Sequence, residues 1–230
     1  MAKSRLFTLM ILLASGSLLK CGENHLPDTP GSSVVSSGGK VVAKRIGQVA
    51  PCDLLTPEIL AAEFNIDASV LEAKPFGKTM CTYNWPKPNQ AEIDQRNEAL
   101  MAEFLPKRLQ AMKRGETLVQ PTMENSYVNI SLTVVDMKDD ARASTAFSKM
   151  IETMAAGVSA EKDGEKATFR MNYDQAIDDI GDQAAWTSKG KQLSFRVGSV
   201  FLHVMVDQSQ DSAQNLRTAK SLAKRIIASI

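Results

Sequence analysis

The sequence predicts an α+β fold: one domain, an antiparallel β-sheet packed against helices, which follows a signal peptide and a flexible tether. Helical patterns lie near both ends of this domain, alternating strand patterns lie between them, and short turns join several strands. The chain has 230 residues, 43% of them hydrophobic, so it can bury one sizeable core. Lysine and arginine (27) nearly balance aspartate and glutamate (26), so the sequence predicts no nucleic-acid partner.

Residues 1–20 have the layout of a secretory signal peptide. Lys3 and Arg5 give a positive start, residues 6–13 form a short apolar run, and small residues occupy 14–17. A membrane-spanning helix needs about 20 apolar residues, which is more than this run contains. The sequence therefore predicts export.

Cys21 is the predicted lipidation site. The segment 18–22 resembles the lipobox of bacterial lipoproteins, although Lys20 occupies a position where a small residue is expected. Cleavage after Gly16 or Ser17 is the alternative, which would give a soluble periplasmic binding protein with a free thiol; an uncleaved anchor is another. Exported proteins usually avoid a stray thiol, which favours lipidation. We expect a lipoprotein facing the periplasm, on the outer membrane in preference to the inner one because Gly22 follows the cysteine.

Residues 21–49 are predicted to be the anchor cysteine and a flexible linker, and residues 50–230 a single domain. The linker is rich in proline, glycine and serine and poor in large apolar residues. Such a composition buries too little surface to offset the entropy of ordering the chain. A tether of this kind lets a lipid-anchored domain stand away from the membrane.

The first elements of the domain are a short helix and two strands. Thr56 can cap a helix over residues 57–64, in which Pro57 suits the first helical position. Strands are predicted over residues 70–75 and 79–85, joined through Gly77.

A long helical segment follows over residues 89–113. Pro106 lies in its interior, which predicts a kink or two helices that meet near Leu105. Its many charges have mixed signs, which predicts a solvated helix face rather than a binding surface.

Apolar and polar residues alternate over residues 127–137, at the start of the second half of the domain. This pattern predicts a strand with one buried and one solvent-exposed face. Asp139 or Asp140 then caps a helix that ends near Gly157. The remaining predictions are a polar loop (159–166), a short strand (167–172), a three-stranded meander (184–188, 192–197, 200–207) and a last helix from Asp211, with a buried stripe of Leu216, Leu222, Ala223, Ile226, Ile227 and Ile230.

Cys52 and Cys81 are predicted to form a disulfide. Oxidising compartments keep such pairs bonded, and no histidine or third cysteine lies near enough in sequence to indicate zinc. A closed loop of about 30 residues stabilises a fold by about 3 to 4 kcal/mol in the chain-entropy model. Two reduced, buried cysteines are the alternative.

The same stretch carries a resemblance to a known family. The segments Cys52-Asp-Leu-Leu-Thr-Pro-Glu58, Cys81-Thr-Tyr83 with Trp85, and 180–186 before a hairpin and a terminal helix resemble a bacterial secreted lipoprotein domain of unknown function. The resemblance covers residues 50–230 and implies an exported, lipid-anchored, non-catalytic α+β domain with its two cysteines bonded. The charged segment 87–115 departs from the pattern of that family.

No catalytic, metal or cofactor site is predicted. A serine or cysteine nucleophile most often needs a histidine, and only His25 in the tether and His203 in a strand are present. Four aspartates near Gly181 could bind calcium, but turn chemistry explains them more simply: Asp174, Asp178, Asp179 and Asp182. The alternative enzyme class is a cell-wall hydrolase acting through carboxylates such as Glu58, Asp178 or Asp182.

Tyr83, Trp85 and Trp186 are the candidate ligand-binding residues. Aromatic rings on a sheet face can stack on a sugar or a peptide, although core packing is the simpler alternative. The sequence thus predicts a non-catalytic binding or structural module of the bacterial envelope. Its expected partners are the membrane, through the lipid, and another envelope protein or a cell-wall component.

Overall fold

The computed structural model describes residues 46–162, 165–171 and 173–229. They form an α+β fold, as predicted, with an open seven-stranded antiparallel sheet and five α-helices. The strand order is β1-β2-β3-β9-β8-β7-β6. In chain order the sheet strands are β1 (Lys74–Phe76), β2 (Met80–Pro86), β3 (Tyr127–Asp136), β6 (Gln175–Ala176), β7 (Gln183–Thr187), β8 (Gln192–Val197) and β9 (Val200–Asp207).

The centre of the sheet is the pairing of β3 with β9, and β9 continues into β8 through a tight turn. The alternation predicted for β3 is confirmed, because Ile130 and Leu132 are fully buried whereas Asn129 and Thr133 keep some exposure. Gly198 occupies the turn with φ +55°, a conformation that favours glycine. This turn pairs Val197 with Val200 and so fixes the register of the hairpin. The predicted three-stranded meander is β7, β8 and β9.

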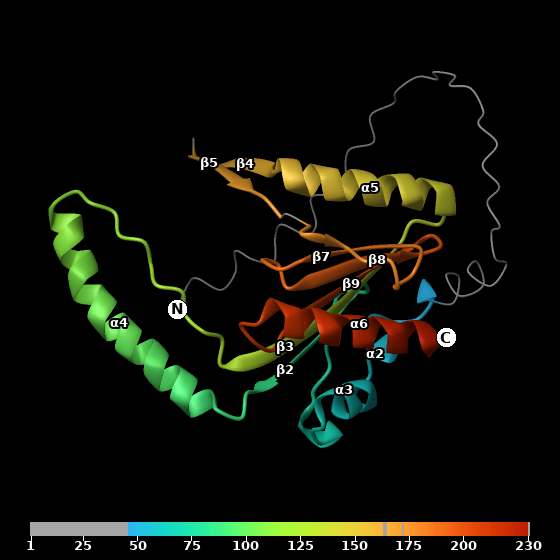
Figure 1. The fold of residues 1–230 in the computed structure, drawn as a ribbon, viewed down its shortest axis with the longest axis horizontal. Coiled ribbons are helices and arrows are strands. Elements are labelled where there is room, and N and C mark those ends of the chain that lie inside the picture. The colour runs from blue at the N-terminus through green and yellow to red at the C-terminus, as the bar shows by residue number, and fades with distance from the viewer. Residues whose placement is uncertain (1–45, 163–164, 172, 230) are drawn as a thin grey trace. The chain divides into compact units, whose positions relative to one another are not determined.

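One face of the sheet is covered by α6 (Ser212–Ala228), with α2 (Pro51–Leu54) and α3 (Pro57–Phe64) on the same side (Figure 1). Asp211 caps α6, as predicted, by accepting a hydrogen bond of 2.8 Å from the amide of Ala213. The predicted stripe is confirmed in part. Leu222, Ala223 and Ile226 are buried, Leu216 and Ile227 are partly buried against the core, and Ile230 lies outside the described residues.

The opposite face carries α5 (Asp140–Ala156) (Figure 1). Phe147 of α5 packs edge-on against Phe201 of β9, with ring centroids 5.6 Å apart. Asp139 is the cap, accepting from the amide of Arg142 at 2.7 Å, and Gly157 ends the helix, so both predicted ends are confirmed. α5 therefore covers β9 on the side away from α6.

One strand prediction is wrong in part, and one loop prediction is wrong. Residues 70–73 are not a strand: Ala68–Val70 form a 3₁₀ turn, because Asp67 accepts a hydrogen bond from the amide of Ser69, and β1 begins only at Lys74. Residues 159–162 and 165–166 of the predicted polar loop instead belong to a separate two-stranded sheet of β4 (Val158–Lys162) and β5 (Glu165–Phe169). A polar sequence can form such a hairpin through backbone pairing and cross-strand hydroxyl contacts, such as the 2.8 Å contact between Ser159 Oγ and Thr168 Oγ1.

The core begins before the predicted end of the linker. Ile46 is fully buried in the same cluster as α6 and the sheet, and Val49 packs against that cluster. The predicted signal peptide, Cys21 and the linker up to residue 45 lie outside the described residues. Among the residues that are described, no helix is both long enough and apolar enough to span a membrane.

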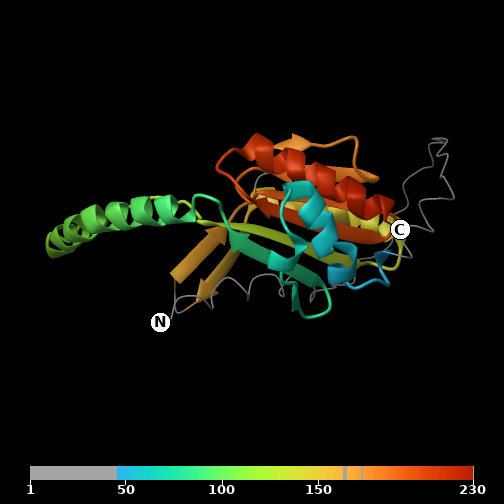
Figure 2. The same cartoon turned by 90° about the horizontal axis from the view of Figure 1, so that it is seen from below.

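The hairpin of β2 and β3 carries a large insertion, residues 87–126, which we call the arm. It consists of α4 (Gln90–Lys113) and a return segment, residues 114–126, without regular secondary structure. α4 is one continuous helix through Pro106, not two helices, and it projects away from the sheet (Figures 1 and 2).

Candidate interaction surface

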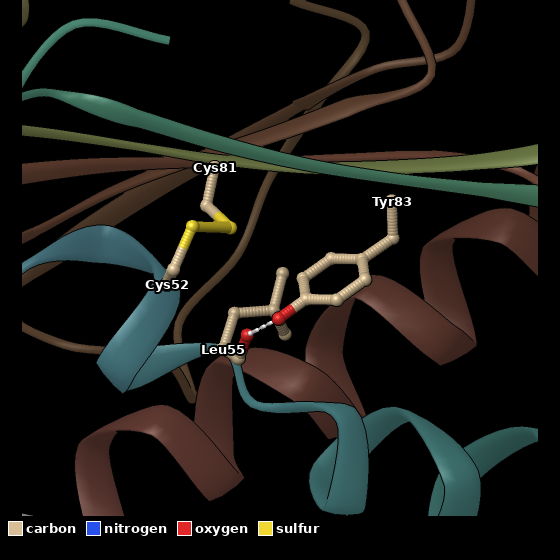
Figure 3. Close-up of a disulfide and its surroundings, with 4 residues drawn as sticks. All are labelled: Cys52, Leu55, Cys81 and Tyr83. Carbon is tan, nitrogen blue, oxygen red and sulfur yellow. Dashed lines mark hydrogen bonds between the residues drawn. A yellow bond between two sulfur atoms is a disulfide. The ribbon is translucent and has the colours of Figure 1, made fainter. Parts of the chain in front are cut away.

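The three predicted ligand-binding aromatics lie in the core. Tyr83, Trp85 and Trp186 are 0%, 6% and 2% exposed. The Tyr83 hydroxyl donates to the carbonyl of Leu55 at 2.7 Å (Figure 3), Trp85 packs edge-on against Phe64, and the indole of Trp186 donates to Ser212 at 3.2 Å. Their ring faces are already covered by protein. In this structure they anchor helices to the sheet and offer no stacking face to a ligand.

The predicted disulfide between Cys52 and Cys81 is present. Its sulfur atoms are 2.09 Å apart, and it joins α2 to β2 beside the Tyr83–Leu55 hydrogen bond (Figure 3). Cys81 is fully buried. These two links hold the start of the domain onto the sheet at neighbouring points.

A polar cluster surrounds His203, the one histidine among the described residues. Its Nδ1 lies 2.8 Å from Ser194 Oγ, and that oxygen is also 3.0 Å from the side-chain Nε2 of Gln192 and 3.2 Å from the hydroxyl of Tyr173. Ser194 was not among the residues predicted from sequence, although the register set by the β8–β9 turn places it directly opposite His203.

This serine–histidine pair is not arranged for nucleophilic catalysis. Ser194 is fully buried, so a substrate cannot reach its hydroxyl in this conformation. Burial lowers the pKa of His203 to about 4, well below the value suited to a general base at neutral pH. Within the described part of the chain, no carboxylate hydrogen-bonds to the imidazole. The cluster is a set of satisfied polar groups between the sheet and Tyr173.

Three of the four aspartates near Gly181 have separate partners. Asp179 lies 2.7 Å from Lys220 and 2.8 Å from Lys224, and these contacts lower its pKa to about 2. Asp182 accepts from the amide of Gly198 at 2.6 Å. Asp174 accepts from the hydroxyl of Ser188 and from its amide at 2.6 Å, and these bonds lower the pKa of Asp174. These contacts satisfy loop amides and lysines.

Glu58 lies in the first turn of α3, where a hydrogen bond with Thr56 lowers its pKa. Asp178 is exposed, and its carboxylate forms no hydrogen bond or ion pair with the other residues that the structure describes. Among the described residues, no group of three or more histidine, cysteine or acidic side chains is placed to bind a metal.

The arm is held by contacts at its base. Glu124 of the return segment and Asn97 of α4 bond reciprocally: the Asn97 amide donates to the Glu124 carbonyl at 2.7 Å, and the Glu124 amide donates to Asn97 Oδ1 at 3.1 Å. The Glu124 carboxylate also lies 2.9 Å from Arg96 and 3.6 Å from the buried Lys87. These long-range contacts dock the return segment onto the first half of α4.

The inner side of α4 is covered. Ile93, Phe104 and Ala111 are buried at helical spacing, and the amide of Glu116 donates to the carbonyl of Ala111 at 2.9 Å. An open hollow of about 300 Å³ lies between Phe104, Arg108 and Met112 of α4 and the return segment, so Met112 lies at the border between the inner and outer sides. The helix therefore uses one face to hold its own return segment.

The outer side of α4 is apolar and exposed in the second half of the helix. Leu105, Leu109 and Met112 are 47%, 61% and 62% exposed, and their spacing of four and three residues places them on one stripe of the helix. Seven of the eleven large apolar side chains exposed among the described residues belong to the arm: Leu100, Leu105, Leu109, Met112, Leu118, Val119 and Met123. Exposed apolar surface is thus concentrated on the arm, and concentrated patches mark interaction sites.

Comparison of the chain with protein-family models, with curated proteins and with solved structures gave no match. The resemblance to the secreted lipoprotein domain therefore stays a prediction. The geometry of the arm is the main guide to function.

Proposed function

We propose that this chain is a non-catalytic binding module of the bacterial cell envelope. It is anchored by a lipid on Cys21, faces the periplasm, and contacts a partner protein through the arm. The observation that carries the proposal is the exposed stripe of Leu105, Leu109 and Met112 on a helix that projects from the domain.

The arm has the properties of a helix that docks into an apolar surface. Its inner face is occupied by the return segment, so the outer stripe is not needed to hold the domain together. Side chains at a spacing of three and four residues are the usual anchors of a helix in a partner groove. A protein partner fits better than a sugar, because no exposed aromatic ring lies on the stripe.

The envelope location is supported by the N-terminal sequence. A positive start, an apolar run and Cys21 precede a linker rich in turn-forming residues. Two or three acyl chains give stable membrane anchoring, at about 0.8 kcal/mol for each buried methylene.

Cys21→Ala should release the protein from the membrane or leave its precursor uncut. Mass spectrometry of the mature N-terminus tests this directly, and the expected result is a diacylated or triacylated Cys21. A mature chain that begins at Ser17 or Leu18 without fatty acid would contradict the anchor. The protein would then be soluble in the periplasm, and the role of the arm would be unaffected.

A photo-cross-linking amino acid in place of Leu109 should form a covalent adduct with a protein partner in intact cells. The same group at Lys189, an exposed residue of the β7–β8 turn, is the matched control and should give no adduct. Leu105→Asn with Met112→Asn should reduce the Leu109 adduct by about tenfold or more, since buried apolar anchors dominate such interfaces. An adduct that persists in the double variant, or that forms equally at Lys189, would overturn binding through the stripe.

A further inference from the structure

We propose that the partner of the arm is a protein helix whose apolar face is bordered by acidic side chains. The inference rests on the proposed function, because it uses the same outer stripe, and it adds the chemistry of the occupant. The ion pairs at the outer end of the arm carry it, because they leave only positive charge beside the stripe.

The outer end of the arm, residues 101–120, has an excess of positive charge. It contains four basic side chains and two acidic ones, which leaves a net charge of +2. Both acids already have partners within the arm. Glu103 lies 2.5 Å from Lys107, and Glu116 lies 2.8 Å from Arg114. The two remaining bases are therefore not balanced by any acid of this end.

These two bases, Arg108 and Lys113, border the stripe on its two sides. Both side chains are exposed, and neither forms an ion pair with another residue that the structure describes. A helix turns by about 100° per residue, which places Arg108 between the stripe and the hollow and Lys113 beyond Leu109 on the other side. The apolar surface therefore has a free cation along each border, and a complementary partner has acids there.

The hollow gives such a partner a place for one apolar side chain. It measures about 300 Å³, and Phe104, Met112 and Leu118 line it together with Arg108. Anchor side chains that fill a pocket dominate the binding energy of many interfaces. On a helix, an acid three or four residues from the anchor lies on the same side, so it can pair with Arg108 while the anchor enters the hollow.

The first half of α4 argues against an anionic membrane or a nucleic acid as the occupant. Asp94 and Glu98 continue the line of the stripe toward the base of the arm, and neither forms an ion pair with another described residue. A helix that lay flat on an anionic bilayer would bring these carboxylates against head groups of the same sign. A protein helix carries charges of both signs and can be acidic only where it faces Arg108 and Lys113.

Charge reversal tests the proposal, with the photo-cross-linking amino acid in place of Leu109 and the yield of adduct in intact cells as the readout. Arg108→Glu with Lys113→Glu should lower the yield by about tenfold or more, because like charges that face each other across an interface exclude a partner. Lys149→Glu with Lys189→Glu changes the net charge equally, at exposed positions outside the arm, and should leave the yield unchanged.

Glu98→Lys is the control within α4, because it reverses an exposed charge of the other sign on the same line of the helix. It should not lower the yield. An equal loss in this variant would show that the sign of the charge does not matter and would overturn the proposal, as would an unchanged yield in the reversal of Arg108 and Lys113.

The sequence of the captured segment gives a test that does not depend on these variants. Proteolysis of the adduct and mass spectrometry identify the segment joined at position 109. It should be an amphipathic helix with acids beside its apolar positions, and the synthetic peptide should bind the purified mature chain more weakly as the salt concentration rises. A segment without acids, or binding that ignores salt, would overturn the proposal.

The outcomes separate this inference from the proposed function. A protein adduct at Leu109 that ignores the charge of Arg108 and Lys113, or an adduct at twice the chain mass, would overturn the acidic helix and leave binding of a protein through the stripe intact. Absence of any protein adduct, with binding of the purified chain to vesicles of anionic phospholipid through the arm, would overturn both.

Discussion

Cys52→Ser or Cys81→Ser is expected to lower the free energy of unfolding by about 2 to 5 kcal/mol. The bond closes a loop that joins α2 to β2, across a sequence separation of 29 residues. Its loss raises the conformational entropy of the unfolded chain and removes a covalent link between the start of the domain and the sheet. Net stabilities are about 5 to 15 kcal/mol, so the loss is a large share.

Urea unfolding of the variants, with and without a reducing agent, measures the effect. The reduced unaltered domain should match the double variant Cys52→Ser with Cys81→Ser, and that variant should not respond to reductant. Hydrogen exchange should show faster opening at α2 and α3 than at α6, because the Tyr83–Leu55 hydrogen bond then becomes the main link of that region to β2. Equal stability of all forms, or two free thiols in the denatured and unreduced protein, would contradict the prediction.

Elements with local signals were predictable from the sequence. The caps Thr56, Asp139 and Asp211 place three helix starts correctly, since each side chain accepts from an amide two or three residues on. Strict alternation located β3, and the turn at Gly198 located the β8–β9 hairpin. In each case the decisive contact joins residues close in sequence or repeats with a fixed period.

Features that depend on distant contacts were not predictable. The reciprocal bonds of Asn97 with Glu124 join residues 27 apart, and no local pattern announces them. For the same reason the mixed charges of α4 did not show in sequence which of them are paired. The ion pair of Arg96 with Glu124 joins two distant parts of the chain and appears only in the structure.

The three aromatics predicted to bind a ligand depend on distant contacts in the same way. Sequence places Tyr83, Trp85 and Trp186 in or beside strands but does not say which face of the sheet a helix covers. The packing of α3 and α6 on that face decides the matter, because it buries all three rings.

The stability of the domain is expected to fall as the pH drops from about 6.5 to about 4, because His203 must take up a proton on unfolding. Its pKa is about 4 in the folded protein, lowered by burial, against an ordinary value of 6.5. The folded state therefore holds the neutral imidazole. The stabilisation is present above pH 6.5 and is lost as the pH falls through the folded pKa, by as much as about 3 kcal/mol.

The groups around the ring do not share this pH range. Ser194 and Gln192 do not titrate, and burial raises the pKa of Tyr173, so its hydroxyl stays neutral. Asp179, with a pKa of about 2, and Asp174, whose pKa is also lowered, lose their stabilisation only below about pH 4. His203 is therefore expected to dominate between pH 6.5 and 4.

His203→Gln isolates the effect, because glutamine keeps a hydrogen-bond partner for Ser194 but does not titrate. Urea unfolding at steps between pH 7 and 4 should show a steep loss of stability in the unaltered chain and a shallow one in the variant. The variant should be less stable than the unaltered chain at pH 7, since the packing of the ring is lost, and the two should converge near pH 4. Parallel pH curves for the two proteins would show that His203 is not the group responsible.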